Sequence, residues 1–361
     1  MTEHQTGDKT TKDPIPLPDE THMGTPTAQP AMGGPATRGD EMEGGPRITG
    51  EQIAKAGPLL ALLLACLYFT IATDQFLKGD NFSLIFQQVM VIGTIAIGQT
   101  IIILTAGIDL SCGAVMAFGS IVMTKMAVDN GVPPVLAILL GIGACVAFGF
   151  INGGLVTFMG LPPFIVTLGT LNIAFALTHI YSNDNTISDL PSAMTALGNT
   201  FDLGGTAVTY GSLVCLGLFA ITWFVLTQTA WGRRVYAIGD APEATRLMGV
   251  NVRRQLLMVY VVAGAIYGVA ALLLVSRTDV GDPNAGQTEN LDAITAVVLG
   301  GTSLFGGRGT IIGTLIGALF VGVLRNGLIL KGVESIYVTL FTGILVILAV
   351  SVDQFARRRA L

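Results

Sequence analysis

Residues 231–255 read WGRRVYAIGDAPEATRLMGVNVRRQ and lie between two long apolar runs. This stretch, called the basic loop below, contains five arginines in a chain that is otherwise poor in basic residues after its first fifty positions: Arg233, Arg234, Arg246, Arg253 and Arg254. Arginines concentrated beside apolar spans mark the cytoplasmic side of a membrane protein. The basic loop therefore predicts a membrane fold and its orientation.

A short helix is predicted in the middle of the basic loop. Pro242 suits the first turn of a helix, Glu243 complements the positive end of the helix dipole, and Gly249 ends the helix. At the inner face of a membrane such a helix is well placed to contact a soluble partner. The alternative is a loop that only sets the topology through its charge, but the patterned stretch 242–251 favours a docking element.

The composition places most of the chain in a membrane. Of 361 residues, 51% are hydrophobic and only 12% are charged, which is more apolar length than a soluble core needs. The predicted fold class is an all-α integral membrane protein with about ten transmembrane helices. The four cysteines lie in or beside apolar runs without CxxC spacing, so they are interpreted as packing residues, and no metal site or catalytic residue is predicted.

Ten spans are expected from the apolar runs. They cover about 53–72, 84–104, a third run ending near 128, 133–158, 164–181, 210–227, 256–275, 291–304, 310–330 and 336–352. Residues 182–208 contain Asp but no Lys or Arg, which predicts an outer loop, whereas the basic loop, Arg308 and the final arginines fall inside. Both termini are therefore expected in the cytoplasm.

The chain divides into three predicted parts. Residues 1–50 are rich in Pro, Gly, Thr and acidic residues and predict a disordered cytoplasmic tail, because they cannot bury enough apolar surface to offset chain entropy. Residues 51–355 form the transmembrane domain, in which residues 229–254 connect to a partner. Residues 356–361 form a basic cytoplasmic tail.

Two segments predict broken or re-entrant helices. Gly107 and Gly113 flank Asp109 between two apolar runs, where an ionisable group is costly unless it faces a cavity or finds partners. The carboxylate is expected to be capped by amides that the break exposes or to face a pathway; an ordinary turn with Asp109 as N-cap of the next helix is the alternative. Gly306 and Gly307 predict a second break in the sequence GTSLFGGR, which lacks the Lys-Ser/Thr ending of a phosphate-binding loop.

Several polar residues interrupt the apolar runs. Asn152, Thr167 and Asn172 can line a path for a hydroxyl-rich solute or bond to neighbouring helices. Phe164 can gate a path or stack on a sugar ring, although contact with lipid or another helix is the simpler role. Arg325 lies deep in an apolar run and requires a partner or water, which the sequence does not name.

A weak internal two-fold repeat is also visible. GIDLS at 107–111, NG at 152–153 and VTLG at 166–169 are followed in the same order by GTSLF at 301–305, NG at 326–327 and VTL at 338–340. Repeats of this kind commonly frame a central translocation path. Chance similarity among glycine-rich spans is the alternative.

Four blocks of the sequence resemble the sugar-type permeases of bacterial ABC importers, the ribose/xylose/galactose permease family. The blocks are AGIDLSCG at 106–113, PFIVTLG at 163–169, GDAPEATRLMGVN at 239–251 and LGGTSLFGGRGT at 299–310. The resemblance extends from about residue 58 to 355 and is specific for the family, although it is weak on the substrate.

The resemblance implies that the short helix is a coupling helix, which docks in a groove of a separate cytoplasmic ABC ATPase subunit. The residues expected to form it are Pro242, Glu243, Ala244, Arg246 and Gly249. The family often has Ala where this chain has Thr245, a change that should not prevent docking.

The resemblance also implies the other partners of the chain. They are a second permease copy, expected as a homodimer, and a periplasmic or lipid-anchored sugar-binding protein, in the bacterial plasma (inner) membrane. ATP and Mg²⁺ bind to the ATPase subunit, so neither a cofactor nor an enzymatic activity is expected in this chain. No nucleic acid partner is expected.

The solute path is expected to be mostly apolar, because the binding protein supplies the selectivity. Its polar contacts are expected from Asp109, Asn152, Phe164, Thr167, Asn172 and Asn326. A secondary transporter or channel for a small polar solute is the alternative and requires paired acids and bases within the membrane. Branched-chain amino acid permeases, which are similar in architecture, are a closer rival, whereas a membrane enzyme has no supporting motif.

Overall fold

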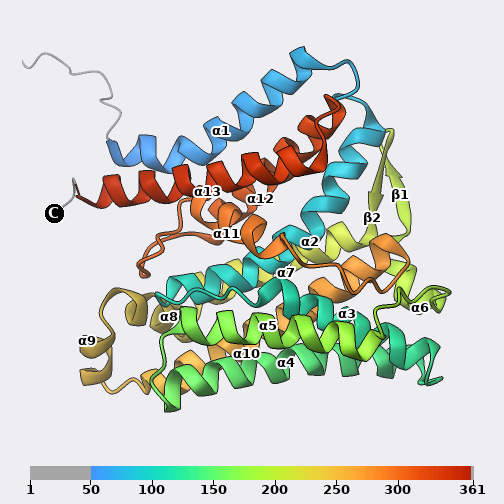
Figure 1. The fold of residues 1–361 in the computed structure, drawn as a ribbon. Coiled ribbons are helices and arrows are strands. Elements are labelled where there is room, and N and C mark those ends of the chain that lie inside the picture. Colours follow the sequence, from blue (N-terminus) through green and yellow to red (C-terminus); the bar gives the residue numbers. More distant parts are fainter. Residues whose placement is uncertain (1–49, 359–361) are drawn as a thin grey trace, which may run out of the picture. The chain divides into compact units, whose positions relative to one another are not determined.

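A computed structural model describes residues 50–358 of the chain, so most of the predicted tail 1–50 and the last three residues lie outside the described part. The described part is almost entirely helical (Figure 1). Its larger helices are α1 Gly50–Ala72, α2 Gly79–Leu104, α3 Cys112–Val128, α4 Pro134–Phe158, α5 Pro163–Ser182, α7 Tyr210–Gln228, α8 Ala230–Asp240, α10 Val252–Thr278, α11 Glu289–Leu299, α12 Ile311–Leu330 and α13 Ser335–Arg358.

Six of these helices are long and apolar enough to cross a membrane: α2, α4, α5, α7, α10 and α12. Shorter apolar stretches of 10 to 17 residues lie at 57–72, 112–128 and 335–348. The helical membrane class is therefore confirmed, while the count of ten crossings stays a prediction.

The predicted span 291–304 is wrong in its extent. α11 ends at Leu299, and residues 300–310 are irregular because Gly301, Gly306 and Gly307 adopt positive φ angles of 84°, 83° and 71°. Eleven residues of helix rise about 16 Å, roughly half of a hydrocarbon core of about 30 Å. α11 therefore covers only part of the membrane thickness.

The segment 182–208, expected as an irregular loop, contains further structure. It includes the one-turn helix α6 Ser192–Thr195, the 3₁₀ turn η1 Ala196–Gly198, and the antiparallel pair β1 Thr200–Leu203 and β2 Thr206–Thr209. Gly204 and Gly205 both have positive φ, as a two-residue hairpin turn requires. The hairpin tip lies directly on Gly79 at the start of α2.

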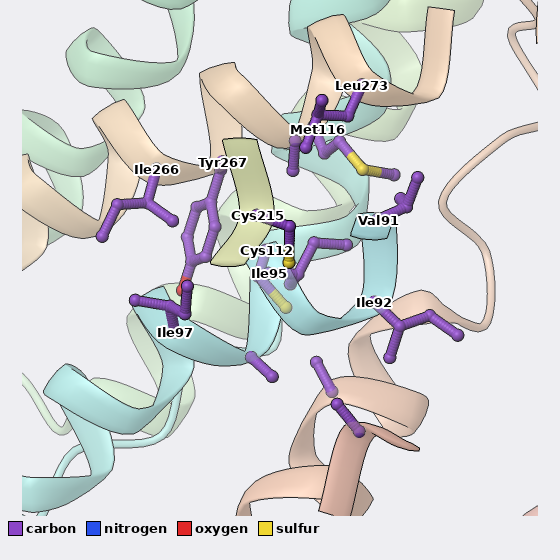
Figure 2. Close-up of a cluster of buried hydrophobic side chains, with 14 of the residues drawn as sticks. Val91, Ile92, Ile95, Ile97, Cys112, Met116, Cys215, Ile266, Tyr267 and Leu273 are labelled. Carbon is purple, nitrogen blue, oxygen red and sulfur yellow. The ribbon is translucent and has the colours of Figure 1, made fainter. Parts of the chain in front are cut away.

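The core is organised around α2 and α10. α10 packs against α4, α2 and α3, and α2 packs against α10, α12, α7 and α11. Figure 2 shows part of this core, with Tyr267 of α10, Ile95 of α2, Met116 of α3 and Cys215 of α7. Because α2 is apolar on all sides it suits a position surrounded by other helices.

α4 and α10 approach each other through small residues. A Cβ atom added to Gly149 would overlap the carbonyl group of Tyr260, and one added to Gly264 would overlap the carbonyl of Cys145. Small residues let helix backbones approach closely where no hydrophobic effect drives association. The contact is thus one of backbone against backbone.

We expect Gly149→Ala to destabilise the protein by about 1–3 kcal/mol, because the new methyl group has no space between α4 and α10. Gly143→Ala is the matched control on the same helix, since nothing lies within 4 Å of its Cβ position. Thermal unfolding of the detergent-solubilised protein measures both. Equal unfolding temperatures would show that the helices are not in close contact.

Candidate functional site

The chain leaves α2 and enters α3 through a buried break at residues 105–111. Ala106 takes a positive φ of 61° there. The Asp109 side chain accepts bonds from the Ser111 amide at 2.8 Å and the Ser111 hydroxyl at 2.6 Å, and the residue is 2% exposed. Ser111, not Asp109, holds the N-cap position of α3. Asp109 is thus a buried carboxylate bonded within a broken segment.

Polar side chains from neighbouring helices bind the backbone of this break. Thr167 of α5 donates to the Ile108 carbonyl at 3.1 Å, and Asn290 of α11 donates to the Leu110 carbonyl at 3.2 Å. In the amide orientation that satisfies both of its ends, Gln99 of α2 donates to the Asp109 carbonyl at 3.1 Å and accepts from the Asp109 amide at 3.3 Å. These bonds satisfy backbone groups of the break that would find no water to bind in a membrane interior.

Three of the predicted path residues, Asp109, Asn152 and Thr167, are brought together by the break. Asn152 of α4 donates to the Ser111 hydroxyl at 3.1 Å and is 1% exposed, and Thr167 is fully buried. In this conformation Thr167 binds the backbone of the break and Asn152 binds a side chain within it, while the Asn152 Oδ1 atom is buried without a hydrogen-bond partner among residues 50–358. Their contact with solute stays a prediction.

The other three path residues lie apart from this group. Phe164 is 48% exposed on α5, and Asn326 is buried in α12, where its Oδ1 has no hydrogen-bond partner among residues 50–358. Asn172 is exposed on α5, bonds to the Leu168 carbonyl, and lines a pocket with Phe175, Asn290 and others.

The four glycines predicted as helix breaks divide into two groups. Gly107 lies in the break after α2, and Gly306 and Gly307 lie in the irregular segment 300–310. Gly113, by contrast, falls in the first turn of α3, so its assignment as a break is wrong. Its small size instead permits direct contact with the Gly286 backbone of the segment that precedes α11.

The basic loop forms two helices, α8 Ala230–Asp240 and α9 Pro242–Leu247. The predicted short helix is therefore confirmed, and Gly249 follows it with a φ of 84°. Glu243 and Arg246 form an exposed ion pair at 3.0 Å. Leu247 and Met248 are 82% and 72% exposed. An apolar tip beside charges is typical of a surface that meets a partner.

Thr245 is the one buried residue in 241–249, at 1% exposure. Its hydroxyl lies 2.9 Å from the carbonyl oxygens of both Ala237 and Ala241, and the side chain thereby holds α9 against the end of α8.

α8 lies between α9 and the two irregular segments of the interior, which are the break at residues 105–111 and the segment 300–310 (Figure 1). The Tyr236 hydroxyl donates to the Gly309 carbonyl at 3.0 Å. The Gly307 amide donates to the Leu104 carbonyl at the end of α2 at 3.0 Å. Gly239 packs between Leu104 and Gly307 with no room for a side chain. A displacement of α8 therefore acts on both breaks.

The sequence did not identify Tyr236 or Thr245, because their roles depend on α8, a helix of the basic loop that was not predicted. A signal was present in α8, where Val235 and Ile238 are three residues apart and both become buried.

Burial raises the pKa of the Tyr236 phenol. Its folded pKa therefore exceeds the ordinary value of about 10, and its contribution to stability is present below that pH and is lost as the pH rises towards the folded pKa. We expect the stability difference between the wild type and Tyr236→Phe to be constant from about pH 7 to 9 and to shift against the wild type above about pH 10. Unfolding temperatures measured from pH 7 to 11 test this, and parallel curves would contradict it.

Membrane-length helices, buried breaks held by side chains, and an exposed helix connected to those breaks define a multi-pass membrane protein of the permease class. Residues 81–350 match the family described as branched-chain amino acid transport system / permease component, and the chain belongs to this family.

Curated relatives extend over most of the chain. It is 45% identical over 311 residues to the fructose import permease protein of Rhizobium meliloti, covering 84% of this chain and 86% of that protein. The ribose import permease protein of Bacillus subtilis is 42% identical over 302 residues, covering 83% of this chain and 92% of that protein. The D-allose transport system permease protein of Escherichia coli is 34% identical over 298 residues, covering 82% and 90%.

Proposed function

We propose that this chain is the membrane-spanning permease subunit of an ATP-driven (ABC) importer, and that it translocates a monosaccharide delivered by a separate binding protein. The observation that carries the proposal is the exposed helix α9, connected through α8 to the two breaks. Two of the relatives described above are named for the import of fructose and ribose and one for the transport of D-allose, all uncharged five- or six-carbon sugars. A pentose or hexose is therefore the proposed solute.

α9 is the proposed contact with the ATPase subunit. Its exposed face combines Glu243, Arg246, Leu247 and Met248, and Thr245 alone is turned inward. ATP and Mg²⁺ bind to the partner subunit, and ATP shifts the permease between inward and outward access because it binds the two states with different affinity. The partner's displacement passes through α8 to the ends of α2 and of the segment 300–310.

We also propose an inverted repeat that relates α2–α5 to α10–α13. Its support is that α3 packs on α4 and α5 as α11 packs on α12 and α13, while α10 packs on α3 and α4 as α2 packs on α11 and α12. Asn152 and Asn326 then occupy equivalent helices. Under this pairing the break 105–111 corresponds to residues 279–288 rather than to the glycine-rich segment 301–305. Such repeats frame transport paths.

The remaining assembly follows from the same function. A second copy of the chain completes the path, and both termini lie in the cytoplasm of a bacterium, with the permease in the inner membrane. The basic loop lies on the same side because its arginines flank α7 and α10.

A secondary transporter is the second candidate, because the structure supplies the paired charges that this function requires. Arg325 of α12 donates to Asp292 of α11 at 3.0 Å between spans. Transport that persists without the ATPase would favour this candidate.

We expect Glu243→Arg to weaken association with the ATPase subunit at least tenfold, equivalent to about 1.4 kcal/mol, because it reverses the charge at the first turn of α9. Glu334→Arg is the matched control, since Glu334 is exposed in the turn between α12 and α13, at the end of α12 away from segment 300–310. Copurification and ATPase assays of the reconstituted complex, with uptake of labelled D-fructose, D-ribose and D-allose, measure the effects.

The importer proposal fails if Glu243→Arg and Glu334→Arg both behave as wild type while sugar crosses the membrane without ATPase. Unchanged thermal unfolding of Glu243→Arg shows that its effect is on docking and not on the fold.

A further inference from the structure

Four charged residues of α10, α11 and α12 lie around two adjoining cavities, and the function described above uses none of them in the import path. Arg277 lies in the last turn of α10, Glu289 and Asp292 lie in the first turn of α11, and Arg325 lies within α12. The Arg325 Nη1 atom donates to Asp292 Oδ2 at 3.0 Å. The Asp292 side chain is 5% exposed and that of Arg325 is 36% exposed, so the guanidinium keeps an open face.

Two adjoining cavities share Arg325 and Ile329. The first, of about 80 Å³, is lined by residues of α11, α12 and α13 that include Asp292, Ser335, Thr339 and Thr342. The second, of about 160 Å³, is lined by Gln88, Val91, Ile92, Arg277, Glu289, Arg325 and Ile329. The second cavity is the larger of the two.

The second cavity contains polar groups that the protein itself leaves open. The Gln88 Oε1 atom is buried without a hydrogen-bond partner in the described part of the chain. Neither Arg277 nor Glu289 forms an ion pair with any residue of 50–358, and Glu289 accepts a bond from the Thr288 amide at 3.2 Å. Ionisable groups between membrane spans are costly and mark functional sites.

The charges of the cluster balance, with two guanidinium groups and two carboxylates. A charged solute would unbalance it, whereas an uncharged polyol would not. Sugar hydroxyls can accept bonds from Arg277 and Arg325 and donate to Glu289 and the Gln88 oxygen, all charge-assisted or otherwise unsatisfied bonds. The Asp292 carboxylate holds Arg325 in position for this contact.

We propose that Gln88, Arg277, Glu289 and Arg325 form a transient binding site for an uncharged polyhydroxylated solute. This proposal rests on the import function proposed above and identifies the residues that would contact the solute. The site differs from the residues that the sequence suggested, because Asp109 and Thr167 form their hydrogen bonds within the break after α2 and the Asn152 amide donates to Ser111 in the same break.

The test uses the assembled transporter, with ATPase and binding protein, in proteoliposomes. The variants are Glu289→Gln, Arg277→Gln and the double variant, which leave the Asp292–Arg325 pair intact. The control is Asp129→Asn at the C-terminal end of α3, which removes a carboxylate that lies outside the two cavities and is paired with Lys125. Uptake of labelled D-fructose and D-ribose is measured beside ATP hydrolysis and thermal unfolding.

We expect each single variant to lower the sugar uptake per ATP hydrolysed at least fivefold. The rate of ATP hydrolysis should stay within about twofold of wild type, and the unfolding temperature should stay within a few degrees. The double variant restores the charge balance. If the residues contact the solute, its uptake is no better than that of the worse single variant. If they only balance charge in the fold, uptake recovers, and that result would overturn the proposal.

The remaining outcomes separate this site from the import function. If the wild type takes up sugar and all three variants take it up equally well, the proposed binding site is refuted but the import function is not. ATP-driven uptake of labelled leucine in place of either sugar would overturn the polyol assignment, because a zwitterion presents opposite charges to Arg277 and Glu289. Absence of any ATP-driven uptake by the wild type would refute the import function, and the site proposal with it.

Discussion

A backbone that leaves its helix inside a membrane must find every hydrogen-bond partner within the protein, and this constraint determines the centre of the structure. The break after α2 meets it with side chains from several helices, as when Thr167 and Asn290 bind the carbonyls of Ile108 and Leu110. The segment 300–310 meets it partly through the end of α2, where Leu104 accepts from the Gly307 amide. Two irregular segments thereby come to depend on the same surrounding helices.

Local patterns in the sequence were sufficient for the features that local chemistry decides. The helix at 242–247 followed from Pro242, Glu243 and Gly249, and the apolar runs gave most helices to within a few residues. The length of α11 was not predictable from apolarity, because Leu299 is followed by glycines whose positive φ angles end the helix in an apolar stretch. The hairpin 200–209 was missed because four-residue strands carry too little alternation.

The site was less accessible to sequence analysis, because its contacts join residues that are far apart in the chain. Arg325 clearly required a partner, yet only the packing of α11 on α12 identifies Asp292 as that partner. The sequence singled out Asp109 as an ionisable group between apolar runs, but only the three-dimensional structure shows that Gln99 binds its backbone and that Asn152 binds Ser111 beside it. Tyr236 was not considered, because its bond to Gly309 crosses between two loops.

The glycine contact between α4 and α10 has a mechanical consequence. Where carbonyl groups of one helix lie directly on the backbone of another, no flexible side chain is available to absorb a relative shift. α4 and α10 must then move as one rigid body, with α2 and α3 packed on it. Any rearrangement between two access states is left to the helices with fewer buried contacts, among them α5, whose outer face is largely exposed apolar side chains. The rigid pair would serve as the fixed frame against which those helices tilt.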